Sequence, residues 1–467
     1  MPMHVQPVDR GARAGLPRKK IIFIALQTWY TSGRRAGWRG IGGDSMGLDK
    51  KLFQQARTVL QGKGLGAGPS GISAADAAHA GWSILDEEVS LPAAVLDASA
   101  LEHNLHWMRE FVAAYGCLLA PHGKTTMSPA LFALQRQAGA WGLTLATAPQ
   151  THTAFAHGER RILMANQLVG RANFALIADL QARDPGFWFA CLVDSPANVA
   201  ALGRYFSGQG QRIRVLLELG VAGGRTGVRD EAQAEAVLAE IARWPAVSLV
   251  GVETYEGVLK DEAAIRALLH RTADTWRQLD DRAAFDETPA LVSGAGSAWF
   301  DVVAEVFAPL AARAQVVLRP GCYLTHDIGA YQQAAERMQA GNPVARRMAT
   351  QLRPALRVWA HVQSRPEPER AIIGLGKRDA AFDAGFPVPA LHHRPGASAP
   401  TPPPSHWRIT AMMDQHAFLH LEADDDLEVG DLLCFDISHP CLTFDKWRHL
   451  LVVDDTHRVI GAIDTHF

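Results

Sequence analysis

Eight short apolar runs alternate with helical patterns through the middle of the chain, and this alternation limits the folds that it can adopt. The runs span residues 117–120, 142–146, 161–165, 188–193, 213–219, 248–252, 290–293 and 315–318. Helix-like segments such as 230–243 and 263–279 separate them. A doubly wound sheet would fit fewer strands equally well, so the count of strands decides. Eight strands alternating with helices predict an α/β protein built on a (β/α)8 barrel.

The pattern changes beyond about residue 342. Strand-like runs follow one another with little helix between them, at residues 355–362, 371–374, 432–435, 450–453 and 459–463. The proline-rich stretch 394–405 predicts a surface loop, because proline cannot pair within a central strand. We therefore predict a barrel over residues 98–341 and a second, β-rich domain over residues 342–467.

Charge and composition exclude several kinds of partner. The net charge of -2 over 467 residues gives no general attraction to nucleic acid or to an anionic membrane. Residues 1–47 are rich in Gly, Arg and Trp without periodicity, which predicts a disordered extension, and Met46 could be the true start. The apolar run 21–26 is too short for a signal-peptide core or a membrane span. Five cysteines without framework spacing favour reduced thiols in a cytoplasmic protein.

The loop after the first predicted strand carries the most reactive side chain. Its sequence is Pro121-His122-Gly123-Lys124-Thr125. Lys124 therefore lies just beyond a strand end, where barrels place their chemistry. A lysine among small residues, without a nearby acidic partner, can be desolvated and made nucleophilic. The alternative is a surface lysine in an ordinary βα loop.

This loop and the Leu-Pro-x-x-Val-Leu-Asp segment at 91–97 carry a family resemblance. The chain resembles the alanine-racemase-like, fold type III pyridoxal-phosphate enzymes, in particular the branch of D-serine dehydratase and D-threonine aldolase. The resemblance runs from about residue 91 to the C-terminus. It implies that Lys124 binds pyridoxal 5'-phosphate covalently and that segment 48–97 partly joins the β-rich domain. It also implies a homodimer that acts on a small D-amino acid.

Glycine-rich loops follow the seventh and eighth predicted strands, where barrels often bind phosphate. Gly294, Gly296 and Ser297 lie between a strand and a helix, so their backbone amides can face a phosphate group. Glycine-rich turns of this kind are also common without a ligand. The resemblance adds Gly321 and Tyr323, from an Arg-Pro-Gly-x-Tyr segment, to the same cradle.

The resemblance assigns three further loop residues to the cofactor ring. Arg225 matches an arginine near the pyridine nitrogen. A guanidinium keeps its proton and would leave that nitrogen largely unprotonated, which tempers the electron-withdrawing strength of the ring. Tyr255 and Asn166 match positions in the ring pocket. The alternative for Arg225 is a scaffold ion pair with Glu218 or Glu253.

A second group of candidate residues lies in the Ser-His-Pro-Cys segment at 438–441. In an extended segment, residues two apart point to the same side, so His439 and Cys441 would face together. Imidazole and thiolate suit zinc, although most His-x-Cys pairs are structural. The segment resembles the Ser-His-x-Cys of eukaryotic-type D-serine dehydratases, which implies a divalent metal, zinc, beside the cofactor. Water or substrate would complete the coordination, and His416 could line the site or be structural.

These residues together predict a D-serine dehydratase-like lyase that depends on pyridoxal phosphate and a divalent metal. It would convert a D-β-hydroxy amino acid to a 2-oxo acid and ammonia, with Lys124 taking the α-proton and the metal acting on the β-hydroxyl. The same parts could serve a D-threonine-type aldolase, whose branch more often has aspartate in place of Cys441. Further alternatives are a racemase and a non-catalytic pyridoxal-phosphate-binding protein.

Overall fold

The structure is a computed structural model that describes residues 48–54, 59–60, 62–66 and 72–467. The predicted disordered extension 1–47 and Met46 lie outside the described residues. Within the described part of the chain, no helix is long and apolar enough to cross a lipid bilayer.

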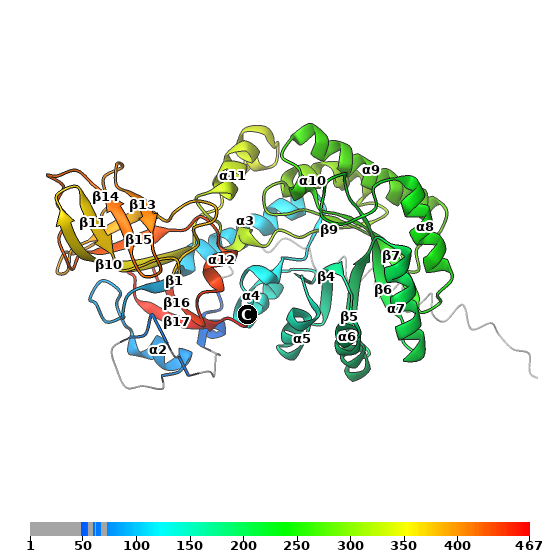
Figure 1. Cartoon of the computed structure of the whole chain (residues 1–467), viewed down its shortest axis with the longest axis horizontal. Coiled ribbons are helices and arrows are strands. Elements are labelled where there is room, and N and C mark those ends of the chain that lie inside the picture. The colour runs from blue at the N-terminus through cyan, green and yellow to red at the C-terminus, as the bar shows by residue number, and fades with distance from the viewer. Residues whose placement is uncertain (1–47, 55–58, 61, 67–71) are drawn as a thin grey trace, which may run out of the picture. The chain divides into compact units, whose positions relative to one another are not determined.

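Eight parallel strands form one sheet, in the order β2-β9-β8-β7-β6-β5-β4-β3 (Figure 1). They are β2 (Leu118–Leu119), β3 (Leu143–Leu145), β4 (Arg161–Gln167), β5 (Trp188–Val193), β6 (Ile213–Leu219), β7 (Val247–Thr254), β8 (Leu291–Gly294) and β9 (Gln315–Leu318). The two ends of this order meet, because the Trp141 amide donates to the Leu119 carbonyl over 2.7 Å and His122 bridges Thr144 in parallel. The sheet is a closed barrel, so the predicted (β/α)8 fold is confirmed.

Helices cover the outside of the barrel (Figure 1). They are α3 (Ala98–Ala114), α4 (Pro129–Gln137), α5 (Ala148–Ala156), α6 (Arg171–Arg183), α7 (Pro196–Gly208), α8 (Glu231–Ala242), α9 (Glu262–Asp281) and α10 (Phe300–Phe307). Several begin where the sequence supplies a capping side chain. Asp97, Thr147, Ser195 and Asp230 each accept a hydrogen bond from the backbone amide three residues further on.

Alternate strand residues fill the interior of the barrel. These buried side chains are Ala120, Leu163, Ala190, Leu192, Leu216, Val250, Leu291 and Val317. Because successive side chains of a strand point to opposite faces, their neighbours face outward. Ile162, Val215 and Val292 are examples, and they belong to the larger core between strands and helices. The interior is therefore packed, and polar side chains collect at the strand ends.

A second sheet of nine strands confirms the predicted β-rich domain. Its strands are β1 (Ala93–Asp97), β10 (Leu356–Glu367), β11 (Arg370–Ile373), β12 (Val388–His393), β13 (Arg408–Met412), β14 (Ala417–His420), β15 (Leu432–Asp436), β16 (His449–Val453) and β17 (Val459–Asp464). Strand β1 pairs antiparallel with β10 and parallel with β16. A strand that precedes the barrel in sequence thus lies inside the sheet that follows it.

Three further helices are α2 (Ala74–Ala80), α11 (Ala330–Gly341) and α12 (Cys441–Phe444). The segment between β15 and α12 lies against the chain that leaves the barrel after β9. The amide of Ile328 donates to the carbonyl of Ile437 over 3.3 Å. This contact brings residues 437–441 to the end of the barrel where strands end and loops begin.

Gly251 in β7 stands where the barrel backbone leaves no room for a side chain. An added Cβ would overlap the carbonyl oxygen of Leu291 in β8. We expect Gly251→Ala to lower the free energy of unfolding by about 1–3 kcal/mol, as overpacking in a core does. Chemical denaturation of the purified protein would measure the loss.

The matched control for this substitution is Gly208→Ala at the end of α7, where an added Cβ would meet no atom within 4 Å. It should leave stability unchanged or raise it by up to about 1 kcal/mol, because alanine restricts the unfolded chain. Equal stability of the two variants would contradict the packing argument.

Candidate active site

Lys124 lies in a single 3-10 turn, η2 (Gly123–Thr125), directly after β2. Its side chain is exposed, whereas Gly123 and Thr125 on either side are buried. Gly123 is tightly packed, because an added Cβ would stand 2.8 Å from the ring of Phe132 in α4. The loop is therefore held firmly while the amine remains free at the strand end.

His122 precedes this turn at the mouth of the barrel, where its backbone bridges Thr144. Burial, together with the nearby charges of Lys124, Arg319 and Arg225, holds the pKa of its imidazole well below the usual range. The ring is therefore neutral near pH 7. Its Nδ1 atom is buried and has no hydrogen-bond partner among the described residues.

A buried ion pair stands beside His122. Arg319, which follows β9, pairs directly with Glu253 near the end of β7, and it also donates to the Thr254 carbonyl over 3.1 Å. Burial raises the pKa of Glu253 to about 8, although the Arg319 charge opposes the shift. One oxygen of Glu253, Oε2, and the Nε of Arg319 are buried without partners in the described chain. The barrel mouth thus holds unused hydrogen-bonding groups.

The predicted ring-pocket residues surround the same opening. The guanidinium of Arg225 lies 4.7 Å from the centre of the Tyr255 ring. Asn166, in β4, donates to the Ala146 carbonyl over 3.0 Å. The alternative partners of Arg225 are engaged elsewhere, since Glu253 pairs with Arg319 and Glu218 accepts hydrogen bonds over 2.6 Å and 2.5 Å from the side chains at positions 226 and 167.

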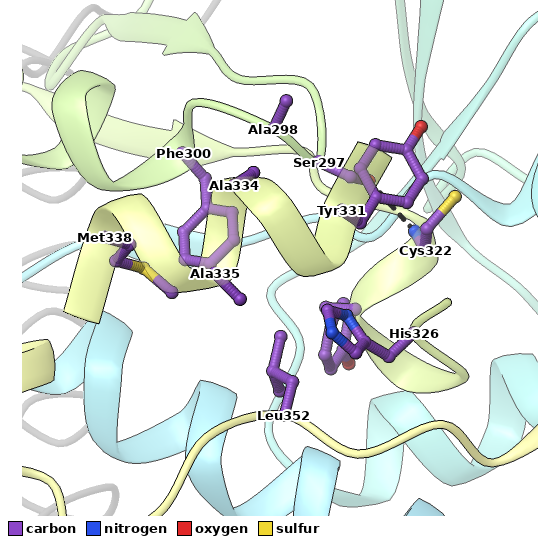
Figure 2. A pocket seen from close by; sticks show the side chains of 11 residues that line it. Ser297, Ala298, Phe300, Cys322, His326, Tyr331, Ala334, Ala335, Met338 and Leu352 are labelled. Carbon is purple, nitrogen blue, oxygen red and sulfur yellow. Dashed lines mark hydrogen bonds between the residues drawn. The ribbon is translucent and has the colours of Figure 1, made fainter. Parts of the chain in front are cut away.

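The loops after β8 and β9 meet through the hydroxyl of Ser297. Its Oγ accepts hydrogen bonds from the amides of Gly321 at 3.1 Å and Cys322 at 3.0 Å, and Figure 2 draws the second bond. Gly294 packs against α10, where an added Cβ would stand 3.0 Å from Val303. The hydroxyl of Tyr323 is buried and accepts a hydrogen bond from Gln135 of α4 at 3.1 Å.

Sequence reasoning missed the role of Glu256, which follows Tyr255 in the loop after β7. The buried carboxylate of Glu256 accepts hydrogen bonds from the amides of Ala295 at 3.1 Å and Gly296 at 2.6 Å. The amide of Gly296, which was predicted to face a phosphate, and the amide of its neighbour Ala295 therefore face a carboxylate in this structure. Backbone amides can bind a carboxylate as well as a phosphate, so the glycine-rich sequence does not distinguish the two. The only sequence signal for this contact is the position of Glu256 next to Tyr255.

The prediction of an extended segment through His439 and Cys441 is wrong. Pro440 has φ -57° and ψ -46°, and Cys441 opens helix α12. The fixed φ of proline suits a helix start, and the amide of Phe444 donates back to the Pro440 carbonyl over 2.9 Å. The two side chains are nevertheless close enough to influence each other, because each shifts the pKa of the other.

Contacts from both domains surround this pair. The Nδ1 of His439 lies 2.8 Å from a carboxylate oxygen of Asp383. The Sγ of Cys441 lies 3.4 Å from the hydroxyl of Thr125 and 3.7 Å from the Sγ of Cys322. The predicted lysine loop and the predicted metal pair therefore adjoin each other.

The thiol of Cys441 is strongly acidified. Its hydrogen bond with Cys322, together with the His439 imidazolium, lowers the pKa of Cys441 to about 4. In turn, Cys441 and Asp383 raise the pKa of the His439 imidazole to about 9. In the described part of the chain, no three His, Cys, Asp or Glu side chains surround a common metal position. The pair itself suits a divalent metal, because a thiolate is a ligand and the carboxylate of Asp383 orients the imidazole.

His416 does not contact the other candidate residues described above. It is exposed in the turn between β13 and β14, where its carbonyl accepts a hydrogen bond from the Met413 amide at 2.8 Å. Its side chain is not needed for any contact described above.

Two sequence families match the chain over separate stretches. The family described as the N-terminal domain of alanine racemase matches residues 96–327, and the serine dehydratase domain family matches residues 355–453. A D-threonine aldolase of Arthrobacter sp is 27% identical over 374 residues, which are 79% of this chain and 90% of that protein. A D-threo-3-hydroxyaspartate dehydratase of Delftia sp. is 36% identical over 137 residues, 29% of this chain and 35% of that protein.

Solved structures share the fold. A D-threonine aldolase from Filomicrobium marinum has a TM-score of 0.68 at 24% identity and covers 82% of this chain and 96% of its own. The Delftia dehydratase has a TM-score of 0.65 at 22% identity and covers 82% and 99%.

These matches define the chain as an alanine-racemase-like, fold type III pyridoxal-phosphate enzyme. It belongs to the D-serine dehydratase and D-threonine aldolase family, whose named members here are lyases. The barrel mouth fits such a cofactor, because an amine, a neutral imidazole and two unpartnered polar atoms gather there. Those buried groups are His122 Nδ1, Glu253 Oε2 and Arg319 Nε.

In the metal-free protein, we expect Cys441 to remain a thiolate at pH values far below the ordinary thiol pKa. Because the pKa of Cys441 is lowered by folding, its thiolate stabilises the folded state. This contribution is fully present above pH 9.0, the pKa in the unfolded chain, and is lost as the pH falls toward about 4. Alkylation of Cys441 by iodoacetamide, followed by peptide mapping, should keep a nearly constant rate between about pH 5 and pH 8.

An ordinary thiol would instead slow about tenfold for each pH unit below its pKa. His439→Asn removes the imidazolium and should restore part of that pH dependence. A wild-type rate that already falls below about pH 8 would refute the thiolate assignment.

Proposed function

We propose that this chain is a D-serine dehydratase-like lyase that depends on pyridoxal 5'-phosphate and a divalent metal. It would convert a small D-β-hydroxy amino acid to a 2-oxo acid and ammonia. One contact carries the proposal: the Sγ of Cys441 lies 3.4 Å from the hydroxyl of Thr125, the neighbour of Lys124. The amine of Lys124 and the pair of Cys441 and His439 can therefore act on one small molecule.

Lys124 is the residue that would hold the cofactor covalently and, once released, accept the α-proton of the substrate. His439 and Cys441 would hold the metal, with Asp383 fixing the imidazole so that its Nε2 faces the ion. When bound, the cofactor spreads the charge that develops at Cα, and the metal polarises the β-hydroxyl. The β-hydroxyl leaves with a proton as water, and hydrolysis of the C–N bond then gives the 2-oxo acid and ammonia.

The remaining predicted residues would shape the cofactor pocket. Arg225 and Tyr255 stack beside each other at the barrel mouth, which suits a planar ring, and Asn166 borders the same opening. The loops that contain Gly294, Gly296, Ser297 and Gly321 meet through the hydroxyl of Ser297, and these residues would form the phosphate cradle. Tyr323 would belong to the same cradle through its place in the loop after β9, and its hydroxyl bonds to Gln135.

Cys441 favours the dehydratase among the members of this family. The Delftia relative is a dehydratase by name, and its solved variants include a histidine-to-alanine change and a cysteine-to-alanine change two positions apart. The cysteine variant was solved in a metal-free form. The same spacing separates His439 from Cys441 here.

A D-threonine-type aldolase is the second candidate. The Arthrobacter aldolase aligns with 79% of this chain, a larger share than the dehydratase does. In that reaction a base removes the proton of the β-hydroxyl, and the Cα–Cβ bond breaks to give glycine and an aldehyde. The α-proton is then left in place, so the two reactions differ in which bond of Cα is cut.

Product analysis separates the two candidates. The full chain, supplied with pyridoxal phosphate and zinc or manganese, would be given D-serine, D-threonine and D-threo-3-hydroxyaspartate separately. We expect equal amounts of 2-oxo acid and ammonia from at least one of them. Glycine with an aldehyde would establish the aldolase, and a coloured protein without turnover would favour a cofactor-binding protein without catalysis.

Lys124→Ala tests the assigned amine. We expect it to lower the rate by at least about 10²–10⁴-fold, the usual contribution of an acid–base group, and to abolish the visible absorbance of the lysine-bound cofactor. Lys51→Ala, at an exposed lysine outside the site, is the matched control and should change neither. An active Lys124→Ala protein would exclude the proposed role.

A further inference from the structure

We propose that Glu256 is a positioning residue for the phosphate group of the cofactor. In the loaded enzyme, Glu256 stays bound to the amides of Ala295 and Gly296 and keeps the loop after β8 in the shape that offers its next amides to the phosphate. This inference rests on the proposed dependence on pyridoxal phosphate. It gives the carboxylate among the cradle amides a role that a glycine-rich sequence alone does not suggest.

Both oxygens of the Glu256 carboxylate hold this loop. Glu256 opens the turn η3 (Glu256–Val258) shortly after β7 and is fully buried. One oxygen accepts the amide of Gly296 at 2.6 Å, and the other accepts the amide of Ala295 at 3.1 Å. Burial raises the pKa of the carboxyl group, while these two amides and the charge of Arg319 favour its ionised form. Hydrogen bonds to an ionised group are stronger than those between neutral groups, so the contact fixes two successive peptide groups.

Ala295 has a backbone conformation that needs such support. Its φ is +85°, in a region that residues with a side chain rarely adopt and that glycine adopts readily. Strain of this kind persists only where the surrounding contacts hold it in place. Because the amide of Ala295 itself donates to Glu256, the carboxylate restrains the strained residue directly.

The packing beside Glu256 opposes its replacement by the phosphate. An added Cβ at Gly296 would stand 2.9 Å from the ring of Tyr255 and 3.5 Å from a carboxylate oxygen of Glu256. Ala295 is only 2% exposed. To bind the same two amides, a phosphate would have to expel a buried carboxylate and enter beside the Tyr255 ring. The phosphate therefore binds further along the loop.

The next two amides are available for that contact. The amides of Ser297 and Ala298 donate to no group within the described part of the chain, and both residues are only partly buried. They directly precede α10, and amides at the start of a helix favour anions. The Ser297 hydroxyl accepts the amides of Gly321 and Cys322, so its own proton is left to donate to a phosphate oxygen (Figure 2).

Two forms of the cofactor separate a phosphate role from a general one, because pyridoxal lacks only the phosphate group of pyridoxal 5'-phosphate. The dissociation constants of both would be measured on the full-length protein by absorbance. Glu256→Gln keeps the shape of the side chain but replaces one acceptor oxygen by a donor. We expect it to weaken pyridoxal phosphate binding by at least about 10-fold, as the loss of a hydrogen bond to a charged group does, and to change pyridoxal binding by less than about twofold.

Glu159→Gln is the matched control. Glu159 is also a buried glutamate, but it precedes β4 at the other end of the barrel, where it accepts a hydrogen bond from Arg136 at 3.2 Å. It should leave both dissociation constants unchanged.

Three results would contradict the proposal in different ways. Equal losses for both forms of the cofactor in Glu256→Gln would mean that the residue supports only the fold. Unchanged or tighter binding of pyridoxal phosphate would mean that the phosphate displaces Glu256 or does not need it. Either result overturns the positioning role and leaves the proposed function standing. A wild-type protein that does not bind pyridoxal phosphate would overturn both.

A second measurement covers the case in which Glu256→Gln fails to fold. A crystal structure of the wild-type protein loaded with pyridoxal phosphate shows which group the amides of Ala295 and Gly296 face. Glu256 retained on both amides, with the phosphate on those of Ser297 and Ala298, supports the proposal. A phosphate oxygen in place of the carboxylate overturns it.

Discussion

The close approach of the first and last barrel strands sets the geometry of the whole site. The amide of Ala120 donates to the Leu318 carbonyl over 2.8 Å, and the loops beyond these strands then pack face to face. Gly321 permits this packing, because an added Cβ would stand 2.6 Å from the Thr125 hydroxyl and 2.7 Å from the His122 carbonyl. Lys124 is therefore held beside the loop after β9, whose Gly321 and Cys322 amides donate to Ser297. A wider junction would separate the amine from the proposed phosphate cradle.

The same junction receives the β-rich domain. The helical turn at Pro440 places the sulfur of Cys441 against Thr125, while Asp383 holds the imidazole of His439 from the other side. Basic and acidic groups thus lie close together: an amine and a neutral imidazole come from the barrel, and a thiol with a lowered pKa comes from the second sheet. In the proposed mechanism the barrel would bind the cofactor and the second sheet would bind the metal that acts on the leaving group, so neither domain alone would hold the complete site.

Local patterns in the sequence were enough to predict the architecture. Each barrel strand is a short apolar run because it is buried on both faces, so all eight were found near their observed bounds. The position of Lys124 just beyond a strand end was predicted for the same reason, because it follows such a run directly. The helical turn at Cys441 was missed, since a two-residue spacing fits an extended segment and a helix start equally well until the conformation of Pro440 is known.

Contacts between distant segments could not be predicted in this way. The amides of Ala295 and Gly296 find the carboxylate of Glu256, which lies about forty residues earlier in the chain. Cys322 meets Cys441 across 119 positions. Neither partner has a local signature, because a buried acid and a buried thiol occur in many cores. Only the closed barrel and the docked second sheet bring these groups together.

Strand β1 makes the apparent two-part organisation misleading for anyone who divides the gene. Its backbone fills the space between β10 and β16, although its codons precede those of the barrel. A fragment that starts at residue 342 would expose the inward edges of both neighbours as open templates for intermolecular pairing, and self-association would follow. Recombination between relatives at that boundary would meet the same difficulty, because the incoming sheet must accept a foreign central strand.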